Sequence, residues 1–215
     1  MEFMLPLVTL PALFLGQGIP LAQYKDPGFN NLVWVQSPNY NQRPANTVID
    51  TIVLHHTAGA TLESCVKWFA TTESRVSAHF TVGKDGSIVQ HVSTFERAWH
   101  AGASRDHRGR ENLNNFTIGI EMVNIGDGKD PWTKEQVEVV GYLIGTLKRR
   151  FPEIKYITSH EFIATPRGRK PDPKNFPWAS LDNHGLELWY DMAKRVDPPA
   201  EALIHPDSLG LGDVE

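Results

Sequence analysis

Histidines and a carboxylate follow directly on apolar, β-branched runs at three places in the sequence. The doublet His55-His56 ends the run VIDTIVLHH, Glu121 lies late in NFTIGIEMVN, and His160 ends IKYITSH. The ends of strands beside loops are where α/β folds place their functional groups. Two histidines and a carboxylate form a ligand set that binds zinc and leaves one coordination position for water. Period-two strand geometry does not choose between the adjacent histidines His55 and His56, which should face opposite ways.

A further metal-ligand candidate is Asp172, in the loop GRKPDPKNF. Lys170 and Asp172 each precede a proline, which favours an extended backbone at both residues. Side chains two residues apart on an extended segment point the same way, so Lys170 and Asp172 should project together. In an active site, Asp172 would bind the metal and Lys170 would face an oxygen that gains charge during reaction. The alternative is an ion pair on the surface of a proline-rich loop.

Other catalytic motifs do not fit the sequence. HEFIA at His160 lacks the second histidine of H-E-x-x-H, and no G-x-S-x-G occurs. The single cysteine, Cys65, shares a helical face with Leu62, Val66 and Phe69, which indicates an interior thiol. Metal-assisted hydrolysis is therefore the best-supported reaction class.

The elements that must position these residues alternate between strands and helices. Strands are predicted at VIDTIVLHH, NFTIGIEMVN and IKYITSH, and a hairpin over 78–92. Helices are predicted over 61–72, with Thr61 as N-cap, and from Thr133 to the stop at Pro152. A helical piece is expected over 180–196. One hairpin among alternating elements predicts a single α/β domain with a central mixed β-sheet flanked by helices.

The chain has 215 residues, 40% of them hydrophobic, and a formal net charge of -4. That length suits one domain, and the charge argues against a nucleic-acid partner. We place the catalytic domain at residues 48–196. A Pro-, Asn- and Gln-rich extended segment over 24–47 precedes it, and a disordered tail over 197–215 follows.

Residues 4–23, within a predicted leader over 1–23, are apolar, broken by prolines, and too short for a comfortable membrane span. They resemble the hydrophobic part of a secretory signal ending near Ala22, without the usual basic start. A second methionine, Met4, suggests that residues 1–3 are an artificial addition. We expect an exported protein, either secreted or periplasmic. The alternative is a cytoplasmic protein whose apolar arm packs on the domain.

Six stretches carry a family resemblance: IVLHHTAG, RVSAHFTVGKDGSIVQHV, RAWHAGAS, NNFTIGIEMVN, TSHEFI and GRKPDP. In this order they resemble the zinc-dependent N-acetylmuramoyl-L-alanine amidases of the AmpD type. That family shares its fold with phage lysozyme-type amidases and peptidoglycan recognition proteins. The resemblance implies that His55, His160 and Asp172 bind one zinc ion. It also implies that Glu121 is the catalytic carboxylate and that Lys170 stabilises the oxyanion.

The resemblance also bears on neighbouring residues. His100 of AWHAG matches a residue of the substrate cleft, and we expect Trp99 and His79 to contact substrate as well. Phage lysozyme-type relatives carry a catalytic tyrosine just before the hairpin histidine, but Ala78 occupies that position here. We expect His56 to have a structural role beside His55 and not to bind the metal.

The implied activity is hydrolysis of the amide bond between N-acetylmuramic acid and L-alanine in peptidoglycan or muropeptides. The alternative is a non-catalytic peptidoglycan-binding module, because relatives that lose a zinc ligand bind without cutting. The intact set of ligands, carboxylate and lysine favours the enzyme. The sequence leaves open the oligomeric state, the stem-peptide specificity and the choice between anhydro-muropeptides and intact wall.

Overall fold

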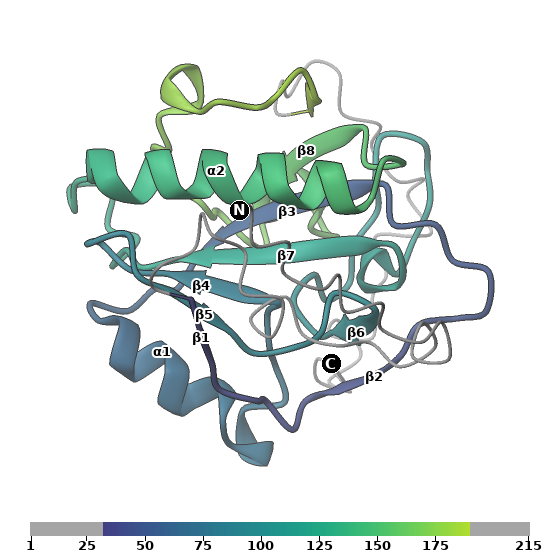
Figure 1. Ribbon diagram of the computed structural model, residues 1–215, viewed down its shortest axis with the longest axis horizontal. Helices are drawn as coiled ribbons and strands as arrows, with labels where there is room; N and C mark the ends of the chain where they lie inside the picture. Colours follow the sequence, from purple (N-terminus) through teal and green to yellow (C-terminus); the bar gives the residue numbers. More distant parts are fainter. Residues whose placement is uncertain (1–31, 190–215) are drawn as a thin grey trace, which may run out of the picture.

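A seven-stranded mixed sheet forms the centre of the computed structural model, which describes residues 32–189 (Figure 1). Its strands are β1 (Leu32–Trp34), β3 (Thr51–His56), β4 (Phe80–Val82), β5 (Ile88–Gln90), β7 (Thr117–Met122), β8 (Tyr156–Ser159) and β9 (Glu187–Trp189). They lie in the order β1-β5-β4-β7-β3-β8-β9. Only the β4–β5 hairpin is antiparallel among these pairs of described strands, and the other neighbours are parallel. The expected mixed sheet is confirmed.

The helices begin where their N-cap residues predicted. Helix α1 (Leu62–Phe69) is capped by Thr61, whose Oγ1 accepts a hydrogen bond from the Ser64 amide at 3.1 Å. Helix α2 (Lys134–Arg150) is capped in the same way by Thr133, which accepts from the Gln136 amide at 3.2 Å. Each such cap stabilises its helix by about 1 kcal/mol. A single turn, α3 (His160–Ile163), follows β8 directly, so His160 starts a helix as its strand ends.

The two faces of the sheet have different characters. Helix α2 lies across one face (Figure 1), where Ile52 and Leu54 of β3 and Ile118 and Ile120 of β7 join the main apolar cluster. Each fully buried side chain of this kind contributes about 1.5–3 kcal/mol. Because side chains alternate along a strand, the odd-numbered residues of β3 and β7 face away from α2. His55 and Glu121 are among these residues and sit opposite one another in the register.

Three parts of the fold differ from the sequence-based expectation. The extended N-terminal segment supplies β1 to the main sheet, and its β2 (Tyr40–Gln42) pairs with an unexpected strand, β6 (Glu96–Ala98). The helix expected over 180–196 is wrong for its described part, because Glu187–Trp189 forms strand β9 beside β8. Trp189 is buried there against Phe162, so sheet packing outweighs the local helical pattern.

The predictions for the leader over 1–23, the tail over 197–215 and the last part of the expected helix lie outside residues 32–189. Within those described residues, no helix is long and apolar enough to cross a membrane.

Arg43 fastens the N-terminal segment to the centre of the molecule. Its Nη1 donates hydrogen bonds to the carbonyls of Asn114 at 2.9 Å and Asn115 at 2.7 Å. Its Nη2 donates to the carbonyls of Thr117 at 2.8 Å and Thr94 at 3.3 Å. Hydrogen bonds from a charged donor are worth about 1.5–3 kcal/mol each, so this guanidinium is a strong attachment point.

Candidate functional site

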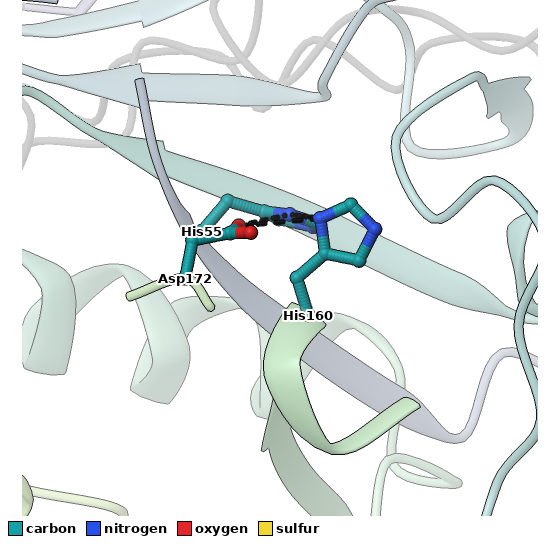
Figure 2. A group of neighbouring side chains, drawn as sticks. All are labelled: His55, His160 and Asp172. Carbon is teal, nitrogen blue, oxygen red and sulfur yellow. Dashed lines mark hydrogen bonds and ion pairs between the residues drawn. The ribbon is translucent and has the colours of Figure 1, made fainter. Parts of the chain in front are cut away.

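Three ligand atoms converge at the end of β3. The distances are 3.0 Å between His55 Nδ1 and His160 Nδ1, and 3.3 and 3.2 Å from these nitrogens to Asp172 Oδ2. Figure 2 shows the three side chains pointing toward one another from β3, from α3 and from the loop that carries Asp172. All three residues are buried. Residues from distant parts of the sequence thus meet as predicted.

The spacing of these atoms matches a tetrahedral zinc site. Zinc bonds of about 2.0–2.1 Å with tetrahedral angles separate neighbouring ligand atoms by about 3.3–3.4 Å. The observed separations of 3.0, 3.3 and 3.2 Å are close to this value. Two imidazoles and one carboxylate are also a ligand set typical of catalytic zinc, in which a fourth position serves the reaction.

The charge state of the ligands suits a cation. Burial opposes ionisation of the Asp172 carboxyl, while the adjacent His160 and His55 rings, when protonated, hold its pKa well below its usual value. Burial also lowers the pKa of His160 to about 4, so its imidazole is neutral at neutral pH. A metal requires a carboxylate and neutral imidazoles, and both Asp172 and His160 meet this requirement.

Backbone contacts hold the Asp172 loop against the strand ends. The Glu161 amide donates to the Asp172 carbonyl at 2.8 Å, which ties the loop to the first turn of α3. The Lys174 amide donates to His56 Nδ1 at 3.2 Å. His56 thus faces away from the ligand atoms and fastens the loop, while His55 joins the metal site. This separation agrees with the period-two geometry of a strand.

Glu121 and Lys170 complete the polar part of the site. Glu121 Oε2 is buried and has no hydrogen-bond partner among residues 32–189. Burial raises the Glu121 pKa to about 7; the neighbouring His55 opposes this rise. Lys170 lines the same cleft, and its charge also lowers the pKa of Glu121. A carboxyl that titrates near neutral pH is well matched to accepting and returning a proton.

These groups open into a cleft of about 660 Å³. One wall is apolar and comes largely from α1, with Cys65, Trp68 and Phe69. Trp68 is 55% exposed, so it lies at the rim of the cleft. The signal for this position was an aromatic side chain directly after Lys67, on the polar side of a short amphipathic helix.

The three residues expected to contact substrate lie in different places. Trp99 lines the cleft and is half-buried, with its Nε1 donating to Asn41 Oδ1 at 2.9 Å. His100 also borders the cleft but is only 5% exposed, and its ring packs edge-on against His55.

His79 has no exposed surface and does not line the cleft. Its Nδ1 accepts from the Gly119 amide at 3.0 Å, which leaves its Nε2 to donate to the Glu96 carbonyl at 3.1 Å. Both ring nitrogens are therefore used inside the protein, and the structure does not place His79 where a substrate could reach it.

The chain matches known amidases over this domain. Residues 44–175 match the family described as Amidase_2, N-acetylmuramoyl-L-alanine amidase. The chain is 34% identical over 165 residues to the 1,6-anhydro-N-acetylmuramyl-L-alanine amidase AmpD of Citrobacter freundii, covering 67% of this chain and 85% of that protein.

Solved structures agree with this match. A crystal structure of a selenomethionine AmpD derivative superposes with a TM-score of 0.62 at 31% identity, covering 74% of this chain and 96% of that one. AmiD of E. coli was solved with its substrate, anhydro-N-acetylmuramic acid-L-Ala-D-gamma-Glu-L-Lys. It superposes with a TM-score of 0.58 at 29% identity, over 71% of this chain and 64% of that one. The chain therefore belongs to the N-acetylmuramoyl-L-alanine amidase family, in its AmpD-type branch.

Proposed function

We propose that this protein uses one zinc ion to hydrolyse the amide bond between N-acetylmuramic acid and L-alanine in peptidoglycan or muropeptides. The observation that carries the proposal is the convergence of three parts in one cleft: a metal-ligand triangle, a lysine, and a carboxyl whose Oε2 is buried without a partner among the described residues. The substrate bound to AmiD contains this bond. A binding module would have no need for a carboxyl oxygen that is buried beside the ligands without a hydrogen-bond partner among residues 32–189.

The residues divide the chemistry among them. His55, His160 and Asp172 would hold zinc, which when bound supplies Lewis-acid activation of water and of the amide carbonyl. Glu121 accepts the proton of the attacking water and returns it to the leaving nitrogen, which departs as the free amine of L-alanine. Lys170 lies on the same cleft and places a positive charge near the oxygen that becomes negative in the tetrahedral transition state.

The aromatic rim supports a substrate-binding role for the cleft. Trp99 and Trp68 both line it, and neither is fully buried. Aromatic faces provide large apolar contact surfaces at binding sites. We assign Trp99, as expected from the sequence, and Trp68 to contacts with the glycan or the stem peptide.

One assay separates the enzyme from a binding module. Purified protein is incubated with cell walls and with muramyl-peptides, with and without a zinc chelator, and new N-terminal alanine is measured. We expect release that the chelator abolishes and added zinc restores. Binding to cell walls without release of alanine at any neutral pH would refute the amidase and leave the binding module.

We also propose that residues 1–23 direct export, so that the enzyme acts on intact wall or on periplasmic fragments. The apolar, proline-broken composition of that stretch supports the proposal. Expression of the full chain in a bacterial host, followed by fractionation and N-terminal sequencing, tests it. Export predicts a mature protein that begins near Gln23, whereas an uncut cytoplasmic protein contradicts export. Comparing rates on whole sacculi and on anhydro-muropeptides then identifies the preferred substrate.

A further inference from the structure

The two candidate metal-binding histidines, His55 and His160, both contact the segment His100-Ala101 through their Nε2 atoms. Each of them directs Nδ1 toward the ligand triangle and Nε2 toward His100 or Ala101. The distance from His55 Nε2 to His100 Nδ1 is 3.0 Å, and that from His160 Nε2 to the Ala101 carbonyl is 3.1 Å. A neutral imidazole has one N–H and one lone pair, so the contact behind each ring determines which nitrogen can bind a metal.

For His160, the chemistry of its partner fixes which atom donates in the hydrogen bond to Ala101. The Ala101 carbonyl can only accept, so His160 Nε2 carries the hydrogen. The His160 Nδ1 lone pair is then free to face the ligand triangle. This arrangement needs no assumption about any other side chain.

At His55 the direction is fixed by a longer chain of hydrogen bonds. It ends at the Leu113 carbonyl, which can only accept, and the Thr117 hydroxyl lies 2.7 Å from it and donates. The Thr117 oxygen is left to accept from His100 Nε2 at 3.0 Å. His100 Nδ1 then lacks a hydrogen and accepts from His55 Nε2. The His55 Nδ1 lone pair therefore faces the metal site.

Two further features keep this segment in place. Asn114 Oδ1 accepts from the amides of His100 at 3.0 Å and Ala101 at 2.8 Å. Gly119, in the middle of β7, leaves the space that the His100 ring occupies, because a Cβ there would lie 2.4 Å from His100 Cγ. A glycine weakens a strand interior, so its presence here is accounted for by the close approach of the ring.

We propose that His100 and Ala101 form one bracket that sets the tautomer of both metal-binding histidines, with Thr117 giving the His55 branch its direction. His100 and Thr117 are then positioning residues that act through His55. This assignment differs from the substrate contact expected for His100. It rests on the metal site of the proposed function, but it can be tested without any substrate.

The decisive variant is Thr117→Val, which keeps the shape of the side chain and removes the hydroxyl. His100 Nε2–H then loses its acceptor, and the opposite tautomer of His100 becomes competitive. That tautomer donates to His55 Nε2 and moves the His55 hydrogen to Nδ1, 3.3 Å from Asp172 Oδ2. We expect zinc affinity, measured by competition with a chromogenic chelator, to fall about 10–100-fold.

Imidazole ¹⁵N NMR of the metal-free protein supplies the readout that a purely structural role would not move. The parent should show His55 with its hydrogen on Nε2, and Thr117→Val should increase the Nδ1–H form. Thr117→Ser should restore both the tautomer and the affinity. Thr146→Val is the matched control, since Thr146 is also buried but lies on α2 and accepts from Arg149. We expect it to leave zinc affinity unchanged.

A second pair of variants keeps the proposal testable if Thr117→Val does not fold. His100→Gln retains an oxygen that can accept from His55, whereas His100→Leu retains only bulk. The leucine variant should bind zinc at least tenfold more weakly than the glutamine variant. The proposal would be overturned if Thr117→Val bound zinc as tightly as Thr117→Ser, His100→Leu bound zinc as tightly as His100→Gln, and the His55 tautomer stayed unchanged. Because neither readout involves a substrate, a failed amidase assay would not be mistaken for a failure of the bracket.

Discussion

Replacement of Glu121 by glutamine should stabilise the metal-free fold while abolishing most of the activity. Burial raises the carboxyl pKa from 4.5 to about 7. Each pKa unit corresponds to about 1.4 kcal/mol, so ionised Glu121 costs the folded state about 3 kcal/mol. An acid whose folded pKa is raised destabilises the fold fully above that pKa and not at all well below its unfolded pKa. The penalty is therefore present above about pH 7 and disappears toward pH 4.5.

The measurement is denaturant unfolding of metal-free parent and Glu121→Gln at about pH 8 and about pH 5. The gain in unfolding free energy should be about 2–3 kcal/mol larger at the higher pH. The burial cost of the neutral amide is the same at both values and cancels in this difference. Glu153→Gln, at an exposed position, is the control and should change stability by less than about 0.5 kcal/mol at either pH.

The same variant, loaded with zinc, should bind the metal as the parent does but lose about 10²–10⁴ in kcat/KM. This loss corresponds to about 3–5 kcal/mol of transition-state stabilisation. A Glu121→Gln protein without the pH-dependent gain would refute the burial argument. A variant that cuts as fast as the parent would refute the assignment of the base. The two results are independent, so each part of the reasoning can fail alone.

Three further predictions concern Lys170, removal of the metal, and the buried His91. Lys170→Met should lower kcat about 10²–10³-fold in steady-state assays with little change in zinc affinity, because its charge acts on the transition state. Chelation should abolish activity and lower Tm, and added zinc should restore both, because a metal that binds only the folded state stabilises it. Burial lowers the pKa of His91 to about 4, below its unfolded value near 6.5, so protonation favours the unfolded state. The unfolding free energy should therefore fall by up to about 3 kcal/mol between pH 6.5 and 4, and His91→Gln should flatten this slope in urea titrations.

The sequence predicted most of the polar residues that the structure gathers at the site. His55, Glu121 and His160 could be found because each lies at or near the end of an apolar run, and neighbouring parallel strands end on one edge. Asp172 was harder, since it comes from a loop, and the two prolines around it supplied the signal. The choice of His55 over His56 as the candidate zinc ligand required the family resemblance, because the alternation of side chains along a strand says only that the two histidines face different ways.

Other features depended on tertiary packing that no local pattern encodes. Strand β9 is three residues long and gains its stability from the edge of β8, so its helical pattern misled us. His79 is buried because its ring lies between Gly119 of β7 and Glu96 of β6, whose backbone groups are hydrogen-bonded to its two nitrogens. His160 Nε2 contacts the backbone carbonyl of Ala101. Every residue has such a carbonyl, so the type of side chain at position 101 could not predict this contact.

The attachment of Arg43 has a practical consequence for anyone who trims this protein. The family match begins at residue 44, one position after the guanidinium that satisfies four carbonyls, among them those of Asn114 and Thr117. A fragment cut to the homologous boundaries would leave those carbonyls without their donor, in the stretch that carries the side chains behind the metal ligands. The folded domain therefore includes residues upstream of position 44, where the family match begins. Expression fragments should begin before β1 and not at the first residue of the family match.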